Sequence, residues 1–465
     1  MKIYNTLTRS LEEFKTIRPG EAMIYACGPT VYNYIHIGNA RPLIVFDCFR
    51  RYLKYRGYKV KFVQNFTDVD DKIINKANTE GKTAKEISER YIAEYKKDAE
   101  GLGVLPADTH PKVTDSMDKI IDIVKKLIYN GYAYQAGGDV YFRTTKFSEY
   151  GKLSHMPLEE LQAGSRVEVN DVKESPLDFA VWKAAKPGEP YWESPWGKGR
   201  PGWHIECSAM ATNYLAHTID VHCGGQDLIF PHHENEIAQS ECATGVEFAN
   251  YWMHNGYINV DNKKMSKSLG NFFTVREVAE KYGYIPIRYM MLQAHYRSPI
   301  NYNEEVIVQC RSSLERIETF RKNLEFSISK AQNGEITDEQ RENIEAKREK
   351  FISVMDDDFN TADGISVIFE LIRDINPYAT GKQQATKELL LLAKEVFEEL
   401  TGVLGLTPKS SDDDITDEIQ KLFEDWAAAR KEKDFEKADN LRDMLNQAGY
   451  IAQVTRQGNQ LVKKS

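Results

Sequence analysis

Residues 23–39 read Met-Ile-Tyr-Ala-Cys-Gly-Pro-Thr-Val-Tyr-Asn-Tyr-Ile-His-Ile-Gly-Asn, and the prediction of the fold starts from them. Its apolar start, Met23–Ala26, predicts a strand. The segment after Arg41 carries apolar residues near helical spacing, with Pro42 early and Gly57 past its end, which predicts a helix. A strand, a turn and a helix in this order present free backbone N–H groups where a phosphate can bind.

A second apolar run, Val60–Phe66, completes a strand, helix, strand unit that is typical of a parallel nucleotide-binding sheet. Between residues 137 and 202 the sequence changes to Gly, Pro and Trp with short strand-like pieces, which indicates an insertion. The sheet pattern resumes at His217–His222, and a helix that Pro231 can open follows the loop at residues 223–225. We therefore expect an α/β fold with an inserted domain.

After about Asn303 the sequence becomes helical, and further helices are expected to about Leu404. One apolar stripe marks the first of these helices: Ile307, Cys310, Leu314, Ile317, Phe320 and Leu324. The run Ser410–Asp414 breaks the pattern and is the best candidate for a linker. A small module from about Asp417 to Ser465 closes the chain.

Length and composition narrow the class of protein. With 465 residues, 41% of them hydrophobic, we expect about three domains with large cores. No apolar run is long enough to cross a bilayer, and residues 1–14 lack the apolar segment that export requires, so we expect a soluble, cytoplasmic protein without a membrane partner. The net charge of −9 argues against indiscriminate nucleic-acid binding, and the six scattered cysteines are typical of reduced thiols.

Two short motifs are suited to holding a triphosphate. In the first, His-Ile-Gly-Asn, which ends at Asn39, Gly38 permits close backbone approach and His36 can donate to an oxyanion. In the second, Lys-Met-Ser-Lys-Ser, Lys264 and Lys267 bracket small residues in a loop that can close on a charged substrate. Either motif alone is more often a turn or a solvated loop. The two together favour phosphoryl or nucleotidyl chemistry, which needs positioning and charge rather than a nucleophilic side chain.

Residue types that ligate metals lie at three separated places. Cys27 ends the first predicted strand, Cys207 lies in Gly-Trp-His-Ile-Glu-Cys, and Pro-His-His-Glu-Asn-Glu opens the later helix. If Pro231 begins that helix, His232 and Glu236 are four apart and share a face, so both can reach one ion. Two thiolates, an imidazole and a carboxylate suit zinc.

The spacing of these residues in the sequence does not decide which of them bind the metal. It does not choose His232 over His233 or His204, and it does not exclude Glu234. The other isolated cysteines outside the glycine loop are interpreted as core residues: Cys48, Cys242 and Cys310.

Six segments spread over nearly the whole chain carry a family resemblance. They read Tyr-Ala-Cys-Gly-Pro-Thr-Val-Tyr at 25–32, leading into His-Ile-Gly-Asn; Asn-Phe-Thr-Asp-Val-Asp-Asp-Lys at 65–72; Gly-Trp-His-Ile-Glu-Cys-Ser at 202–208; Phe-Pro-His-His-Glu-Asn-Glu at 230–236; Lys-Met-Ser-Lys-Ser at 264–268; and Met-Asp-Asp-Asp-Phe-Asn at 355–360. On these segments the chain resembles the class I aminoacyl-tRNA synthetases, and within them the cysteinyl-tRNA synthetases.

The resemblance implies that one zinc ion binds the substrate thiolate directly and is held by Cys27, Cys207, His232 and Glu236. A pocket of the right size separates cysteine from serine or alanine by only about 1–3 kcal/mol, whereas zinc favours a soft thiolate. Four protein ligands normally indicate a closed structural site, so this role requires the coordination to expand or Glu236 to bind weakly.

Further site residues are implied by the same likeness. Gly28, Thr67 and Trp203 should line the amino-acid pocket, with plain packing as the alternative for Trp203. ATP, with Mg²⁺, should be held by the two motifs and a glycine-rich loop: His36, Gly38, Asn39, Gly224, Gly225, Asp227, Lys264 and Lys267. The two motifs should also be catalytic. The cysteine carboxylate attacks the α-phosphorus and pyrophosphate leaves, and the 2′-hydroxyl of the terminal tRNA ribose then intercepts the adenylate by accepting its cysteinyl group.

Two positions depart from the family pattern. Asn39 stands where many class I enzymes have histidine, and asparagine can still donate a hydrogen bond. Cys223 stands where glycine is common. Its position beside His222 leaves open a redox-sensitive or additional soft-metal contact, although a small side chain tolerated in a turn is the simpler interpretation.

The implied domains are a Rossmann-like catalytic domain in two halves at 1–115 and 200–245, a connective insertion at 116–199, a stem-contact region with the lysine loop at 246–302, a helical bundle at 303–405 and an anticodon-binding module at 415–465. In the last module Arg430, Phe435 and Asp439 fall on one predicted helical stretch and should read single-stranded anticodon bases by stacking and edge hydrogen bonds.

The resemblance thus implies a monomeric cysteine–tRNA ligase whose substrates are L-cysteine, ATP and tRNA(Cys). One alternative is a ligase that transfers activated cysteine to an amino sugar, but such an enzyme should not need the module after Asp414. A catalytically silent RNA-binding relative is the other alternative, and the intact lysines of the loop count against it.

Overall fold

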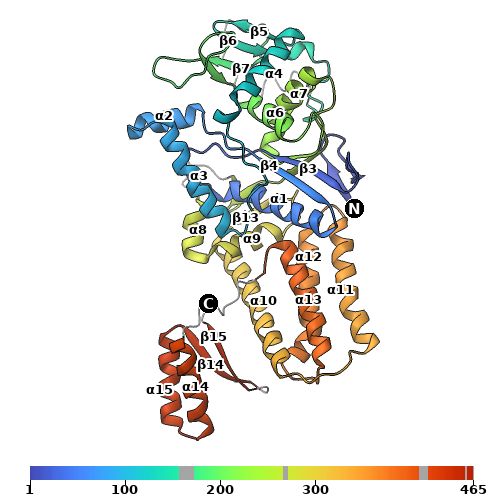
Figure 1. The fold of residues 1–465 in the computed structure, drawn as a ribbon, viewed down its shortest axis with the longest axis vertical. Coiled ribbons are helices and arrows are strands. Elements are labelled where there is room, and N and C mark those ends of the chain that lie inside the picture. The colour runs from blue at the N-terminus through green and yellow to red at the C-terminus, as the bar shows by residue number, and fades with distance from the viewer. Residues whose placement is uncertain (157–171, 265–270, 408–416, 456–457, 464–465) are drawn as a thin grey trace. The chain divides into compact units, whose positions relative to one another are not determined.

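The computed structural model describes residues 1–156, 172–264, 271–407, 417–455 and 458–463 (Figure 1). It contains two compact units, Met1–Ile307 with Met355–Ala362 and Val308–Val354 with Asp363–Ser465. The finer domain boundaries stay a prediction, and the predicted linker at residues 410–414 lies outside the described residues. Within the described ranges, no helix combines the length and the apolarity that crossing a membrane requires.

A four-stranded parallel sheet forms the centre of the first unit, in the strand order β10-β9-β3-β4. Its strands are β3 (Glu21–Ala26), β4 (Lys59–Gln64), β9 (Ile219–Gly225) and β10 (Ala249–Asn255). Every residue of β9 is buried, as expected for a strand covered on both faces. The chain order reverses between β3 and β9, and ligands bind beyond the carboxyl ends of the strands at such a point. The predicted parallel sheet is confirmed.

Helix α1 (Ile37–Tyr55) connects β3 to β4 and begins earlier than the helix predicted after Arg41. The His36 Nδ1 atom accepts a hydrogen bond from the Asn39 backbone N–H at 3.2 Å, and the Asn39 Oδ1 atom accepts one from the His36 backbone N–H at 3.2 Å. This reciprocal cap satisfies two helix-end donors, so the helix starts directly after His36 and Pro42 lies inside it.

Seven further helices of eight residues or more are described in the first unit up to β13 (Ile300–Tyr302): α2 (Asp71–Glu80), α3 (Ala84–Gly101), α4 (Met117–Tyr129), α6 (Trp203–Tyr214), α7 (Glu234–Thr244), α8 (Val275–Tyr282) and α9 (Tyr284–Leu292). The predicted insertion is present as an antiparallel sheet of β5 (Ala133–Ala136), β6 (Asp139–Phe142), β7 (Phe179–Ala184) and β8 (Gly199–Pro201). Short strands complete the unit: β1 (Lys2–Asn5), β2 (Ser10–Glu13), β11 (Ile258–Val260) and β12 (Lys263–Lys264).

The helix expected to open at Pro231 starts later, so that prediction is wrong. A short π-helical turn, Ile229–His233, comes first, and α7 begins at Glu234. Within the turn Phe230 is extended, with φ −135° and ψ 134°. A residue before proline is disfavoured in the α region, which explains the interruption at this point.

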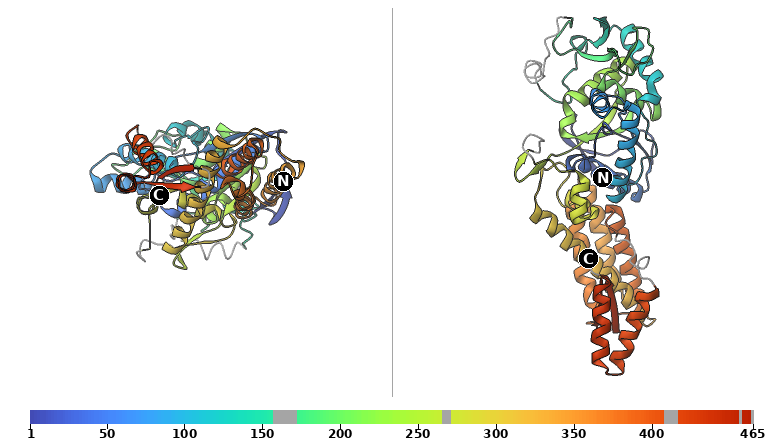
Figure 2. Two further views of the ribbon diagram at one scale, coloured as in Figure 1. Left: turned by 90° about the horizontal axis from the view of Figure 1, so that it is seen from below. Right: turned by 90° about the vertical axis from the view of Figure 1, so that its left-hand side faces the viewer.

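In the second unit four long helices lie side by side (Figures 1 and 2). They are α10 (Glu304–Lys330), α11 (Asp338–Asp356), α12 (Thr361–Ala379) and α13 (Lys387–Leu404), which confirms the predicted helical region. Phe320 of α10 packs edge-on against Phe397 of α13 at 5.1 Å between ring centroids. Residues of the predicted stripe are buried, except that Leu314 is half-buried.

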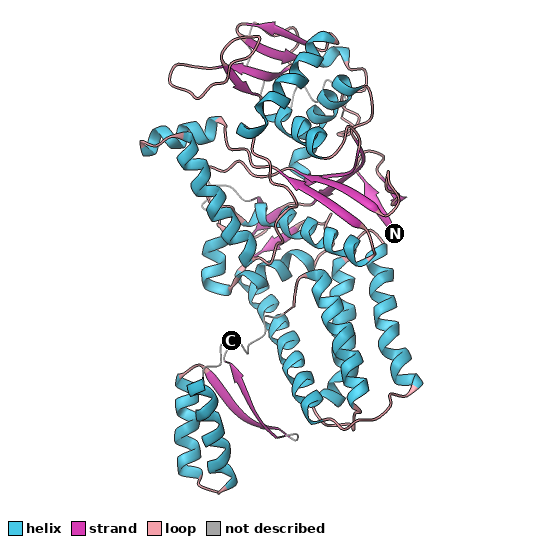
Figure 3. Ribbon diagram, in the orientation of Figure 1, coloured by secondary structure: helices cyan, strands magenta, loops and turns pink. Residues whose placement is uncertain are grey.

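The last module consists of α14 (Asp417–Lys431), α15 (Phe435–Gln447), β14 (Tyr450–Thr455) and β15 (Gly458–Lys463), two helices and a hairpin (Figure 3). Trp426 and Leu445 are buried in its core. The prediction that Arg430, Phe435 and Asp439 share one helical stretch is wrong. The chain turns between α14 and α15, where Lys433 adopts the left-handed conformation with φ 64°, so Arg430 lies on the first helix and the other two on the second.

Candidate functional site

The four predicted metal ligands come together at the carboxyl ends of the parallel strands. Cys27 follows β3, Cys207 lies on α6, His232 lies just before α7 and Glu236 lies in its first turn. Their ligand atoms all lie within 4.8 Å of one another. His232 Nε2 is 3.0 Å from Glu236 Oε1, so the two side chains share a face although the helix starts after His232.

A second group of ligand atoms meets the same distance limit among the described residues: Cys27, His222, His233 and Glu236. Sequence reasoning left His233 open and missed His222. His222 lies near the carboxyl end of β9, in register with Tyr25 of β3, and its Nε2 atom is 2.8 Å from Glu236 Oε2. A signal was available, because side chains at this end of a parallel sheet face the ligand site.

The two other open candidates face elsewhere. His204 Nδ1 is 2.8 Å from His232 Nδ1, so His204 lies behind His232 rather than in either group. The buried Glu234 carboxylate accepts hydrogen bonds from the backbone N–H groups of Gly151 at 2.9 Å and Ser154 at 2.8 Å, and thereby holds the insertion against α7.

A chain of buried hydrogen bonds extends behind the second group. His233 Nδ1 is 2.8 Å from His254 Nε2, and His254 Nδ1 is 2.8 Å from the Thr6 hydroxyl. Burial and neighbouring histidines lower the pKa of His233 well below its ordinary value, and burial lowers that of His254 to about 3. Both rings are therefore neutral at pH 7, and His233 presents Nε2 to the Cys27 sulfur at 3.4 Å.

The side chains at the centre of the cluster shift one another's pKa values through their contacts. Burial raises the pKa of Glu236, but His222 and His232 outweigh it and lower the value to about 2. Burial lowers the pKa of His232, but Glu236 and Cys207 raise it to about 10. A hydrogen bond from Cys27 lowers the pKa of Cys207 to about 6, whereas burial raises that of Cys27. An arriving cation can displace the protons that this network shares.

The donor chemistry fits zinc. Two sulfur atoms, one imidazole nitrogen and one carboxylate oxygen are the ligand types of zinc sites, whereas calcium and magnesium prefer oxygen alone. Cys223 belongs to neither group: it is buried in β9 and its thiol lies 3.5 Å from the Tyr25 carbonyl oxygen. All six cysteines are free thiols.

Two of the predicted amino-acid pocket residues lie directly beside this cluster, Gly28 next to Cys27 and Trp203 against His232. A Cβ atom on Gly28 would lie 1.6 Å from the Asn65 carbonyl oxygen, so only glycine fits beside Cys27. Trp203 is 41% exposed, and its ring centroid lies 4.3 Å from that of His232.

Thr67 is buried, and its hydroxyl donates to Glu206 Oε2 at 2.8 Å. Glu206 and Asn65 were missed by sequence reasoning. Burial, and then Cys207, raises the pKa of Glu206 well above its ordinary value. The Asn65 Oδ1 atom accepts from the Gly28 N–H at 2.8 Å and lies 3.8 Å from the Cys207 sulfur. Both residues lie within segments that carry the family resemblance, which was the available signal.

The described residues that are predicted to bind phosphate lie at the start of α1, at the end of β9 or just after it, and at the end of β12. His36, Gly38 and Asn39 form the start of α1, and because His36 Nδ1 accepts the capping bond, the neutral ring carries its proton on Nε2. Gly224 and Gly225 end β9, and the exposed Asp227 follows them. Lys264 ends β12, and Lys267 lies outside the described residues.

Family comparisons cover most of the chain. Residues 13–312 match the family described as tRNA synthetases class I (C) catalytic domain, residues 350–407 the DALR domain, and residues 412–460 the cysteinyl-tRNA ligase anticodon binding domain. The cysteine–tRNA ligase of Caldicellulosiruptor saccharolyticus is 54% identical over 464 residues, 99% of either chain.

Solved structures show the same fold at low identity. The methionyl-tRNA synthetase of Mycobacterium tuberculosis, in complex with methionyl-adenylate, aligns with a TM-score of 0.65 at 16% identity, over 84% of this chain and 92% of that one. The LeuRS of Agrobacterium radiobacter K84 aligns with a TM-score of 0.60 at 12% identity, over 84% and 85% of the two chains. The class I fold and the family matches together show that the chain belongs to the cysteinyl-tRNA synthetases.

Proposed function

We propose that this cysteine–tRNA ligase selects its amino acid through one zinc ion held by Cys27, Cys207, His232 and Glu236. The observation that carries the proposal is the meeting of these four ligand atoms, from three separate chain segments, within 4.8 Å. Zinc bound there would supply a soft acceptor for the substrate thiolate, which serine and alanine cannot match. A pocket without this preference gains only about 1–3 kcal/mol of discrimination.

Glu236 is the ligand that can bind weakly, as a substrate position requires. Its Oε2 atom is engaged by His222 at 2.8 Å, while Oε1 lies 3.3 Å from the Cys27 sulfur and 3.0 Å from His232 Nε2. Only one carboxylate oxygen therefore faces the ligand cluster. The second ring nitrogen is engaged in both candidate histidines, by His204 for His232 and by His254 for His233. We choose His232 over His233 because the group with His232 includes two thiols, Cys27 and Cys207, whereas the group with His233 includes Cys27 alone.

The adjoining residues hold the amino acid in place. Gly28 leaves room beside Cys27, and the exposed face of Trp203 closes the side next to His232. Thr67 contributes by holding Glu206, because its hydroxyl proton is donated to that carboxyl group at 2.8 Å.

ATP is activated by charge and position. We assign the His36 Nε2–H, the N-terminal end of α1 around Gly38 and Asn39, and the lysines Lys264 and Lys267 to the triphosphate. We assign the glycine-rich end of β9 and the acidic residue that follows it to the ribose and phosphates of ATP: Gly224, Gly225 and Asp227. The cysteine carboxylate attacks the α-phosphorus, and pyrophosphate leaves. The 2′-hydroxyl of tRNA(Cys) then attacks the carbonyl carbon of the adenylate, and AMP leaves. Mg²⁺ bound with the nucleotide would offset the charge of its phosphates.

Anticodon reading is assigned to the last module. Phe435 is 62% exposed, which suits stacking on an unpaired base. The Arg430 guanidinium lies 5.5 Å from the centroid of the Trp426 ring, and Asp439 pairs with Arg442 at 2.9 Å. The match of residues 412–460 to an anticodon binding domain counts against the amino-sugar ligase. A monomeric state and a cytoplasmic location stay predictions.

A single pair of variants tests the zinc proposal. Cys207→Ser should lose bound zinc, measured by inductively coupled plasma mass spectrometry, together with cysteine-dependent ATP–pyrophosphate exchange. Cys242→Ser is the matched control, because Cys242 is buried outside both ligand groups and should keep both properties. If Cys207→Ser retains full zinc and still rejects serine, the proposed ligand set is refuted.

A further inference from the structure

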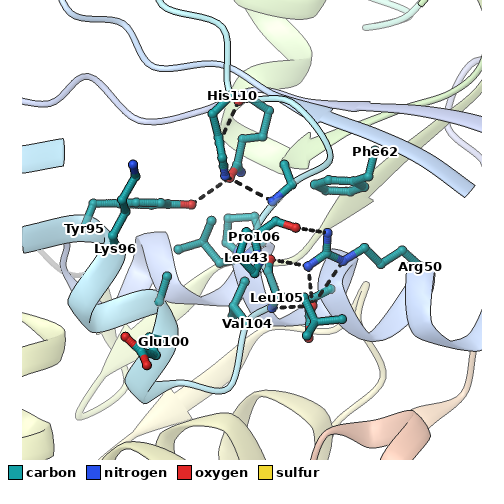
Figure 4. Close-up of a pocket in the computed structure, with 15 residues that line it drawn as sticks. Leu43, Arg50, Phe62, Tyr95, Lys96, Glu100, Val104, Leu105, Pro106 and His110 are labelled. Carbon is teal, nitrogen blue, oxygen red and sulfur yellow. Dashed lines mark hydrogen bonds and ion pairs between the residues drawn. The ribbon is translucent and has the colours of Figure 1, made fainter. Parts of the chain in front are cut away.

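A cavity in the first unit lies on the outer side of β4, away from the reversal of strand order (Figure 4). Its volume is about 430 Å³, which is in the range of small-molecule sites. Helix α1, strand β4, helix α3 and the segment at residues 104–110 line it. None of the metal-cluster or phosphate-binding residues described above contributes to its lining.

The interior polar groups of this cavity already bind one another. The Tyr95 hydroxyl donates to Gln64 Oε1 at 2.7 Å, and His110 contacts the Gln64 carbonyl oxygen at 2.9 Å while its Nε2 atom accepts from the Ala107 N–H at 3.1 Å. What remains for a ligand is hydrocarbon surface from residues such as Pro42, Leu43, Ala99 and Val104. A ligand body that enters must therefore be apolar.

Two charged residues at the floor of the cavity, Asp47 and Arg50, belong to a cluster that extends beyond the lining and carries excess positive charge. The buried Asp47 carboxylate is shared by three guanidinium groups, those of Arg50, Arg51 and Arg288, each at 2.8 Å. Burial raises the pKa of Asp47, but the three arginines outweigh it and lower the value. Neutral backbone carbonyl groups take other N–H groups of the arginines, for example Pro106 O at 2.9 Å from Arg50 Nη1. One carboxylate cannot neutralise three guanidinium groups, so an anion is favoured nearby.

The mouth of the cavity adds one charge of each sign, Lys96 and Glu100, both exposed on α3. Burial lowers the pKa of His110, and the positive charges of Lys96 and Arg50 act in the same direction. His110 is thus neutral, and the interior that it lines lies in a positive potential.

We propose that this cavity is a second small-molecule site that binds a monocarboxylic acid with an apolar, ring-sized body. The apolar walls take the body, and the arginine floor with Lys96 attracts the carboxylate. The site is separate from the proposed cysteine and ATP site, so the two proposals can fail independently. Its floor, α1, is also the helix that His36 caps, so an occupant contacts the same rigid element as the nucleotide.

The test uses the intact protein and three fluorinated probes of one size: 4-fluorobenzoate, 4-fluorobenzyl alcohol and 4-fluorobenzylamine, followed by ¹⁹F relaxation. We expect the carboxylate to bind at least about fivefold more tightly than the alcohol, and the amine to bind weakest. Non-specific attraction to a chain of net charge −9 would give the opposite order for the two charged probes. Saturating ATP and cysteine should leave the bound carboxylate in place.

Two variants localise the signal. Lys96→Glu should weaken 4-fluorobenzoate about threefold to tenfold, and the neighbouring Lys97→Glu, outside the cavity, should not. Ala99→Phe fills the cavity and should abolish binding. The proposal is overturned if the carboxylate does not bind, if the amine or alcohol binds as well, if ATP with cysteine displaces the probe, or if Lys96→Glu and Lys97→Glu behave alike. Lys96 and Lys97 lie on the surface, so the two lysine variants test the proposal even if Ala99→Phe fails to fold.

Discussion

Replacing Gly28 with alanine should disable cysteine activation while leaving the fold in place. A Cβ atom at this position would lie 1.6 Å from the Asn65 carbonyl oxygen, whereas real Cβ contacts are essentially never shorter than 3.0 Å. The ends of β3 and β4 must therefore separate by about 1.4 Å, the difference between these two distances. Cys27 directly precedes Gly28 and must move with it.

The expected size of the effect follows from this displacement. Metal–ligand distances tolerate only about 0.2 Å, so zinc binding should be lost or strongly weakened. Misplacement of reacting groups by about 1 Å costs roughly a hundredfold in rate, and overpacking costs about 1–3 kcal/mol of stability. We therefore expect cysteine-dependent kcat/KM to fall at least about a hundredfold while cooperative unfolding persists.

Three measurements check this expectation: pyrophosphate exchange, metal content and urea unfolding. The matched control is Gly402→Ala on α13, where the nearest atom to a Cβ is Thr407 Oγ1 at 3.8 Å, an ordinary contact. This control should retain exchange activity and gain slightly in stability. Full zinc content and activity in Gly28→Ala would show that the strand ends can part without cost, and would refute the reasoning.

Three further predictions concern stability. Glu234→Gln should lower the free energy of unfolding by about 2 kcal/mol, because the carboxylate that accepts from Gly151 and Ser154 is buried, whereas the exposed Glu247→Gln should change little in the same urea titration. Burial raises the pKa of Asp358, but hydrogen bonds from His295, Tyr4 and Arg297 outweigh burial and lower this pKa, so the stabilisation that the carboxylate provides is present at neutral pH and is lost as the pH falls below about 4. Asp358→Asn should therefore flatten the dependence of the unfolding free energy on acid pH, and an unchanged slope would contradict this prediction. Trp426→Ala should cost about 3–5 kcal/mol of stability in the core of the last module, and it should abolish tRNA charging but not pyrophosphate exchange. The control is Met444→Ala, at a half-exposed position on α15, which should leave both activities intact. Loss of pyrophosphate exchange in Trp426→Ala would contradict independent action of the module.

The amino-acid sequence was sufficient to predict the fold class, and it supplied the residues that we propose for the site. Strand β3, the helix that follows it and the cysteine, histidine and glutamate residues were recognisable because their signals are local: apolar periodicity, glycine in a turn, and ligand types at helical spacing. The family resemblance rested on the same short segments. None of these signals depends on how distant segments pack.

Packing of the folded chain sets which of these residues lie close together. The two overlapping groups of ligand atoms, the engagement of Glu236 by His222, and the positions of Glu206 and Asn65 all depend on distances between elements far apart in the chain. The separation of Arg430 from Phe435 depended on one turn at a left-handed residue, which helical periodicity cannot reveal. The cavity beside β4 is likewise absent from any single segment. Periodicity and spacing report contacts within a few residues, whereas the distance between side chains of different elements is set by the packing of the whole unit.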